Sequence, residues 1–216
     1  MSDQTQLLKI ERHHLPSVAQ VHLAAFPSSA LTRLGIEVVR RYYDWQLFGP
    51  HDHEFVGLFH GQNLQGYAVG GISMGATGGF IKQNLGLLCW KVATHPWLIR
   101  IGRFRGRLRT ALRVVFARRS RIENALPLAN ASSFGVLAIA VDPRAHGKGY
   151  GKLLMDKLES SARDRGFSRM HLTVAFDNAH AIAFYEHLAW RKSETGNQWN
   201  GRMEKQLAST TYLRQP

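Results

Sequence analysis

The stretch that decides the fold of this chain is Val141-Asp142-Pro143-Arg144-Ala145-His146-Gly147-Lys148-Gly149-Tyr150-Gly151-Lys152. It follows an apolar run at residues 134–140 and precedes a pattern of helical spacing that ends near Gly166. This order predicts a strand, a glycine-rich turn and a helix. Glycine adopts positive φ and lets a ligand approach the backbone closely, and the free N–H groups at a helix N-terminus attract phosphate. The stretch therefore predicts a turn that binds a phosphate or pyrophosphate.

The glycine spacing excludes two common phosphate-binding motifs. The dinucleotide fingerprint needs G-x-G-x-x-G and an acidic residue after the next strand. This chain has G-x-G-x-G, and the next expected strand, at residues 170–175, carries no such acid. A nucleotide P-loop needs Gly-Lys-Ser/Thr after four spacer residues, and that sequence is absent from the turn.

The turn and the strand before it instead resemble the acyl-CoA loop of the GNAT superfamily of N-acyltransferases. The run from Leu137 through Lys152 matches that motif almost position by position. The family usually carries Gln or Arg where this chain has His146. That departure is mild, because the family binds the pyrophosphate largely through backbone N–H groups.

A second segment strengthens the resemblance. From Leu172 onward the chain is similar to the next strand and helix of the family, with Asn178, Ala181, Phe184-Tyr185 and Ala189-Trp190 in the matching order. The two segments together cover about residues 134–195. A glycine-punctuated strand and helix from an unrelated protein would not explain Asn178 and Tyr185.

The resemblance implies an α/β (α+β) fold with a mixed, mostly antiparallel central sheet of about seven strands flanked by helices. The first third fits this order: a strand at residues 7–11, helical patterns at 16–25 and 31–48, and a hairpin of strands at 54–60 and 64–73. The remaining strands are expected at residues 134–141, 170–175, 190–194 and 202–207.

The resemblance also implies acetyl-CoA as co-substrate and a set of residues that bind it. In the family the central strand is splayed from its neighbour, and its free backbone groups pair with the pantetheine arm. The expected cofactor-binding residues are Leu137, Ile139, Val141, Arg144, His146, Gly147, Lys148, Gly149, Tyr150, Gly151, Lys152, Asn178 and Tyr185. The pyrophosphate is expected on the amides of residues 146–152.

Tyr185 is the expected catalytic acid. Asn178 and Tyr185 are seven residues apart, which would place them on nearly the same face of a helix. The resemblance implies that this face lies at the thiol end of the cofactor. A tyrosine of pKa about 10 is protonated at neutral pH and can donate to a thiolate of pKa about 8.5. The alternative is a core aromatic side chain packed with Phe184 and Leu188.

The sequence does not identify a single general base. Six residues lie near the strands expected to border the acceptor or near the second motif: His53, Glu54, His60, His171, Asp177 and His180. Each could take a proton directly or through water. An enzyme that binds the neutral amine needs no base at all.

The chain is expected to be one domain over residues 1–216, with a basic helical insertion at about 75–132 and a loose tail after about 208. The insertion opens with a glycine-rich connection at residues 75–79. Residues 97–121 then carry an apolar stripe, nine arginines and no acid. This run fits a docked amphipathic helix, a membrane-surface helix, or a lid whose arginines hold an anionic acceptor.

Composition narrows the protein class. Hydrophobic content of 44% and charged content of 20% are those of a globular protein. A single cysteine, Cys89, excludes an internal disulfide and is expected in the core. The histidines show no compact ligand spacing, so no metal is predicted. With no signal-peptide pattern and no bilayer-length apolar run, we expect a cytoplasmic protein, with contact to a membrane surface through residues 97–121 as a further hypothesis.

The predicted function is acetyl-CoA-dependent N-acetylation of a primary amine. An amino sugar or nucleotide-linked amino sugar is the first acceptor considered, because residues 25–43 resemble a subgroup encoded among bacterial polysaccharide genes. The alternatives are a protein or peptide N-acetyltransferase and a non-enzymatic acyl-CoA-binding module that docks on a membrane or partner. The net charge of +13 would suit nucleic acid, but no recognised nucleic-acid-binding module accompanies it, and the sequence carries no signal of oligomeric state.

Overall fold

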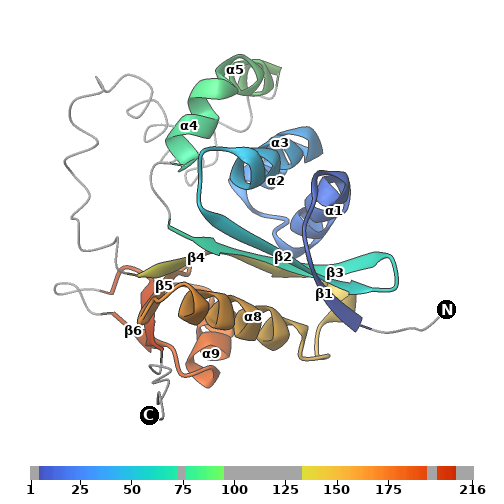
Figure 1. Ribbon diagram of the computed structural model, residues 1–216. Helices are drawn as coiled ribbons and strands as arrows, with labels where there is room; N and C mark the ends of the chain where they lie inside the picture. Colours follow the sequence, from blue (N-terminus) through green and yellow to red (C-terminus); the bar gives the residue numbers. More distant parts are fainter. Residues whose placement is uncertain (1–4, 73–75, 95–132, 194–198, 208–216) are drawn as a thin grey trace, which may run out of the picture.

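A seven-stranded sheet forms the centre of the protein in a computed structural model that describes residues 5–72, 76–94, 133–193 and 199–207 (Figure 1). The strand order is β1-β2-β3-β4-β5-β7-β6. The strands are β1 (Thr5–Lys9), β2 (His53–His60), β3 (Asn63–Gly71), β4 (Phe134–Val141), β5 (Arg169–Thr173), β6 (Arg191–Lys192) and β7 (Arg202–Gln206). Every neighbouring pair is antiparallel except β4 and β5, which are parallel. The predicted fold class is therefore confirmed.

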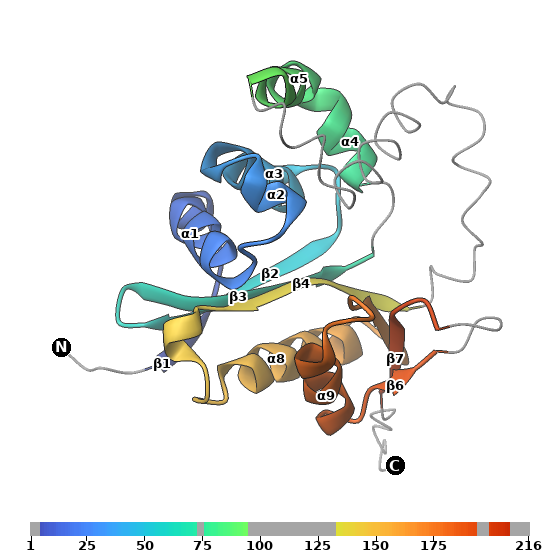
Figure 2. The same cartoon turned by 180° about the vertical axis from the view of Figure 1, so that it is seen from behind.

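Helices cover both faces of the sheet (Figures 1 and 2). On one face lie α1 (Leu15–Ala25), α2 (Ala30–Arg33) and α3 (Ile36–Phe48), with α4 (Ala76–Gln83) and α5 (Leu85–Thr94) beyond them. On the other face lie α8 (Tyr150–Asp164) and α9 (Ala179–His187). Two single turns of 3-10 helix, η1 (Arg12–His14) and η3 (Pro143–Ala145), precede α1 and α8.

The sheet separates two hydrophobic cores, and β2 shows how one strand serves both. Successive side chains of a strand point to opposite faces. Phe55 and Phe59 pack in the core under α1 and α3, whereas Val56 and Leu58 pack in the core with α8 and α9. Because both faces are covered, β2 is an almost continuous apolar run rather than an alternating one.

Two helical predictions in the first half need correction. The pattern at residues 31–48 is not one helix, because the chain breaks between α2 and α3 at Gly35, whose φ is +95°. An interior residue of a helix cannot take that backbone angle. The prediction of a glycine-rich connection at residues 75–79 is also wrong in part, since α4 begins at Ala76 and includes Gly78 and Gly79.

Other boundaries and one burial prediction differ as well. The first strand lies at Thr5–Lys9 instead of residues 7–11, and the sixth has only the two residues Arg191–Lys192. Cys89 is exposed on α5 rather than buried in the core. The arginine-rich run at 97–121 and the tail after 208 lie outside the described residues. No helix in the described ranges is long and apolar enough to cross a bilayer.

Truncating Leu158 should destabilise the fold strongly. Its side chain is completely buried on α8 against the sheet, so Leu158→Ala should lower the free energy of unfolding by about 2–5 kcal/mol. Leu153, on the same helix, is 42% exposed, and the same substitution there should change stability by less than about 0.5 kcal/mol. Urea titration of both variants measures the difference. Equal losses would mean that α8 does not pack on the sheet by this face.

Candidate functional site

The separation of two parallel strands opens the site. β4 runs along β3 from Gly135 to Val141, but it pairs with β5 only at Phe134 and Gly135. Beyond that point the strands diverge around a cavity of about 1600 Å³ that residues 136–141 and 172–175 help to line. Ligand cavities for drug-sized molecules are roughly 300–1,000 Å³. The space is therefore large enough for two reactants.

A β-bulge marks the start of the divergence. Val69 is opposite Ala138 and Gly70 is opposite Val136, so Leu137 is an extra residue in β4. A bulge bends its strand and redirects side chains. Leu137, Ile139 and Val141, the three strand residues predicted to contact the cofactor arm, all line the cavity.

The glycine turn lies at one end of the same cavity. Gly147 and Gly149 have φ of +77° and +75°, in the left-handed region. A Cβ atom at either position would meet no atom within 4 Å, so the backbone angle rather than crowding requires glycine there. Gly149 is the N-cap of α8. The first N–H groups of this helix are therefore presented at the turn, together with the positive end of its dipole.

The basic side chains around the turn are engaged locally. Arg144 forms an ion pair with Asp142 at 2.7 Å, and its hydrogen bonds hold the pKa of that carboxyl below its usual range. The Lys152 ammonium lies 2.6 Å from Asp156. Lys152 lines the cavity, whereas Arg144 and Lys148 do not. The backbone of the turn therefore lines the cavity, whereas two of its three basic side chains do not.

The remaining predicted residues of the turn also line the cavity: His146, Gly147, Gly149, Tyr150 and Gly151. His146 is exposed, and its ring Nε2 lies 3.2 Å from the carbonyl oxygen of Val141. A Cβ atom at Gly151 would come within 3.2 Å of the Phe184 ring. This close approach lets the start of α8 pack against α9.

Tyr185 enters the cavity wall from α9, across from β4. The side chain is only 8% exposed, and its ring packs against Phe184 and Trp190. Burial raises the pKa of Tyr185 to about 12. The hydroxyl is therefore protonated throughout the neutral range, as a proton donor must be.

Asn178 lies before α9 rather than in it. Its Oδ1 accepts the N–H of Ala181 at 3.1 Å, which makes it the N-cap of the helix. Asn178 and Tyr185 both line the cavity. The predicted helical spacing between them holds only from Ala179 onward, because the cap residue itself is not in the helical conformation.

The structure separates the six candidate bases. Only His180 lines the cavity, and the other five do not. The ring of His53 stacks on His51 and lies 3.2 Å from the carbonyl oxygen of Gln46. The Nδ1 of His171 lies 2.9 Å from the hydroxyl of Ser133. No group of three or more His, Cys, Asp or Glu side chains in the described residues could hold a metal ion.

A buried polar cluster on the far side of β4 escaped the sequence analysis. His22 on α1 is 6% exposed, and its Nδ1 lies 2.9 Å from the hydroxyl of Tyr43. The Tyr43 and Tyr67 hydroxyls lie 2.5 Å apart, and the Nε2 of His22 lies 3.3 Å from Ser29 Oγ. Burial lowers the pKa of His22 to about 4, so the ring is neutral. The sequence feature that could have revealed this cluster is the position of His22, a polar residue on the apolar stripe of α1.

Comparison with known proteins finds a family match over part of the chain. Residues 111–190 match the model of the acetyltransferase (GNAT) family. A mycothiol acetyltransferase from Beutenbergia cavernae is 39% identical over 62 residues, which are 29% of this chain and 21% of that protein. The matched segment thus spans about a fifth of that relative's length.

Solved structures extend the similarity over nearly the whole chain at the level of the fold. The ribosomal-protein-S18-alanine N-acetyltransferase from Escherichia coli has a TM-score of 0.55 at 15% identity, covering 99% of each chain. The PaiA N-acetyltransferase from Thermoplasma acidophilum, solved with coenzyme A, has a TM-score of 0.57 at 13% identity, covering 94% of this chain and 99% of that one. The family model thus matches residues 111–190, and the solved structures show that nearly the whole chain has the same fold as these N-acetyltransferases.

Proposed function

We propose that the protein transfers an acetyl group from acetyl-CoA to the nitrogen of a primary amine. The observation that carries this proposal is one cavity that joins a glycine turn, a free strand edge and a buried tyrosine hydroxyl. The Thermoplasma relative of the same fold is a coenzyme A complex. The matched family consists of acetyltransferases.

The cavity suits the three parts of the co-substrate. The pyrophosphate would accept hydrogen bonds from the backbone N–H groups at residues 146–152, where Gly147 and Gly149 open the turn. The amide-bearing pantetheine arm would pair with the edge of β4 that β5 leaves free after Gly135. The thioester would then lie near Tyr185.

The chemistry requires a neutral amine. Its lone pair attacks the thioester carbonyl carbon, the C–N bond forms, and negative charge collects on the carbonyl oxygen. A backbone N–H of β4 stabilises this oxyanion. As the C–S bond breaks, the Tyr185 hydroxyl donates its proton to the departing thiolate. The surplus amine proton passes to water, or to His180, which is the one candidate base in the cavity wall.

The identity of the acceptor stays a prediction from the sequence. It could be an amino sugar, as in the subgroup encoded among polysaccharide genes, or the α-amine of a protein or peptide. If the protein is instead a non-enzymatic acyl-CoA-binding module, it should bind acetyl-CoA without turnover.

Release of free CoA from acetyl-CoA in the presence of an amine panel tests the activity. The panel holds simple alkylamines, amino sugars, nucleotide-linked amino sugars, polyamines and short peptides. Turnover with one class is expected, because the cavity has room for an acceptor beside the cofactor. Acetyl-CoA binding with silence across the panel would instead favour the module.

Removing the hydroxyl of Tyr185 should slow the chemical step. General acid catalysis contributes roughly 10²- to 10⁴-fold, so Tyr185→Phe should lower kcat by at least about tenfold. The affinity for CoA, measured calorimetrically, should change little because the ring remains packed between Phe184 and Trp190. An unchanged kcat at saturating substrate would show that Tyr185 is only a core aromatic residue.

Adding a side chain at Gly149 should weaken CoA binding. A non-glycine residue in the left-handed region costs about 1–2 kcal/mol, so a turn that relaxes in Gly149→Ala should bind CoA about five- to thirtyfold more weakly. Gly61 offers a matched control, with φ of +58° and equally open surroundings in the β2–β3 turn. Gly61→Ala should lose similar stability and keep its CoA affinity. Equal affinities in both variants would exclude the turn as the pyrophosphate site.

A further inference from the structure

We propose that the cavity wall built by helices α1–α5 binds an apolar body of the acceptor, so that the substrate is a primary amine carrying a hydrocarbon or aromatic group. This inference rests on the proposed acetyl transfer and names its acceptor class. We call this surface, formed by the cavity-lining residues between positions 22 and 88, the acceptor wall.

The position of the acceptor wall identifies its occupant. The turn, the β4 edge and α9 account for the cofactor, and they line one part of the cavity. The acceptor wall lines another part of the same cavity. Leu137 and Ala138 of β4, which also line the cavity, pack against the hydrophobic core under α1 and α3. A molecule held there can reach a thioester that lies along β4. The second reactant is therefore the occupant that the geometry favours.

The chemistry of the wall is apolar. No lysine, arginine, aspartate or glutamate within the described part of α1–α5 lines the cavity. The large hydrocarbon side chains that line it are Phe26, Leu31, Leu34, Phe80, Ile81 and Leu88, beside the rings of His22, Tyr42 and Tyr43. Such a surface gains free energy by removing hydrocarbon from water.

Three polar side chains of the wall, those of His22, Ser29 and Tyr43, lie within hydrogen-bond distance of one another or of Tyr67 and Thr32, which do not line the cavity. Tyr67 lies within hydrogen-bond distance of Tyr43, and Tyr43 within that of His22 Nδ1. The other ring nitrogen of His22 lies near Ser29 Oγ. Ser29 in turn donates to Thr32 Oγ1 at 2.9 Å. This chain of contacts gives the polar atoms of His22, Ser29 and Tyr43 partners within the protein.

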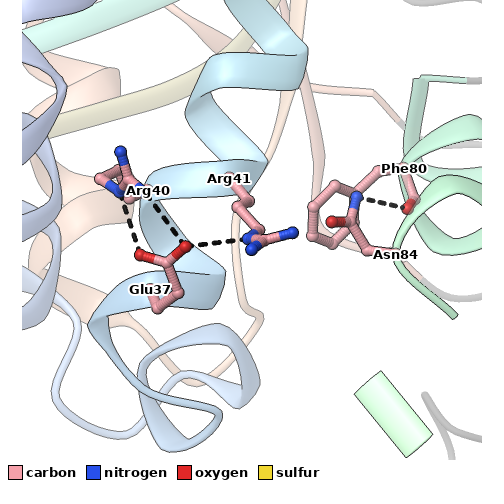
Figure 3. Close-up of polar contacts among 5 residues, drawn as sticks. All are labelled: Glu37, Arg40, Arg41, Phe80 and Asn84. Atoms are coloured by element: carbon pink, nitrogen blue, oxygen red, sulfur yellow. Dashed lines mark hydrogen bonds and ion pairs between the residues drawn. The ribbon is translucent and has the colours of Figure 1, made fainter. Parts of the chain in front are cut away.

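Three charged side chains of α3 are also paired with each other. On α3, Arg40 and Arg41 both donate to Glu37 (Figure 3). Hydrogen bonds from Arg40 and then Arg41 lower the pKa of Glu37 to about 2. None of these three residues lines the cavity.

Phe80 fixes the outer part of the wall. Its ring meets the ring of Tyr42 edge-on, with centroids 5.4 Å apart, and so joins α4 to α3. At the end of α4, the side-chain amide of Asn84 donates to the Phe80 carbonyl at 3.1 Å (Figure 3). Phe80 is 4% exposed. The apolar wall is thus a packed surface.

These features disfavour hydroxyl-rich acceptors on this wall. A sugar ring placed there would lose its hydrogen bonds to water and would find the polar side chains of the wall already engaged. A hydrocarbon or aromatic group makes no such hydrogen bonds to water and so loses none on binding. The inference therefore differs from the amino-sugar acceptor considered from the sequence.

A homologous series of n-alkylamines, from ethylamine to octylamine, tests the inference with acetyl-CoA as donor. The amines share one reacting group, and rates are compared per neutral amine with those of glucosamine. Burial of each methylene should raise kcat/KM about three- to fourfold until the space is filled. Calorimetric binding of hexylamine to the protein–CoA complex gives a second readout that needs no turnover.

Two leucine variants locate the effect. Leu31→Asn places an amide of similar size in the wall; since burying an amide against hydrocarbon without a partner costs about 1–3 kcal/mol, the variant should lower kcat/KM for hexylamine about tenfold, with CoA affinity unchanged. Leu153 is an exposed helical leucine outside the cavity, so Leu153→Asn should leave both quantities unchanged.

The outcomes separate this inference from the proposed function. Rates that rise with amine length, and fall in Leu31→Asn alone, support both. Acetylation of glucosamine without any gain along the alkyl series overturns the inference and leaves acetyl transfer standing. A second series, of acyl-CoA donors from acetyl to octanoyl with ethylamine as acceptor, covers the other occupant. Rates that rise with the length of the acyl group and not with that of the amine also overturn the inference, since the wall then holds the acyl chain. Silence with every amine, together with bound acetyl-CoA, overturns both.

Discussion

The early separation of β4 from β5 is the constraint on which the rest of the site depends. Paired strands satisfy one another's backbone groups, so a strand edge left free needs another partner. Here β4 keeps its ladder with β3, while β5 is held in antiparallel pairing by β7. The two strands meet at only two pairs of residues. The gap between them is therefore part of the sheet's own connectivity, and it presents backbone polar groups to a ligand.

The two walls of the cavity belong to different hydrophobic cores. Tyr185 packs in the core of α8 and α9, together with Leu172 and Trp190. Tyr43 and Tyr67 pack in the core of α1 and α3. Because the sheet stands between these cores, a change in the acceptor wall need not disturb the half of the cavity assigned to the cofactor. This separation gives a physical basis for one cofactor site serving different acceptors.

Local conformational demand explains which predictions from the sequence were confirmed. Two glycines in the left-handed region, a strand before them and a helix after them are all specified within a few residues, so β4, the turn and α8 were predicted close to their observed places. The interior of α4 was not. It is helical despite Gly78 and Gly79 because the chain packs closely there: a Cβ atom at Gly79 would lie 2.5 Å from the Trp45 ring.

The sequence by itself determined the glycine turn with the strand before it and the helix after it, because these follow from spacing along a continuous stretch of chain. The mixed sheet followed from the resemblance that this stretch carries. It also pointed to Tyr185, through the motif around it. Tertiary structure alone decided that His22 meets Tyr43 and Tyr67, 21 and 45 residues away. No local periodicity encodes such contacts. They arise when α1, α3 and β3 pack together, and that packing shapes the wall opposite the cofactor.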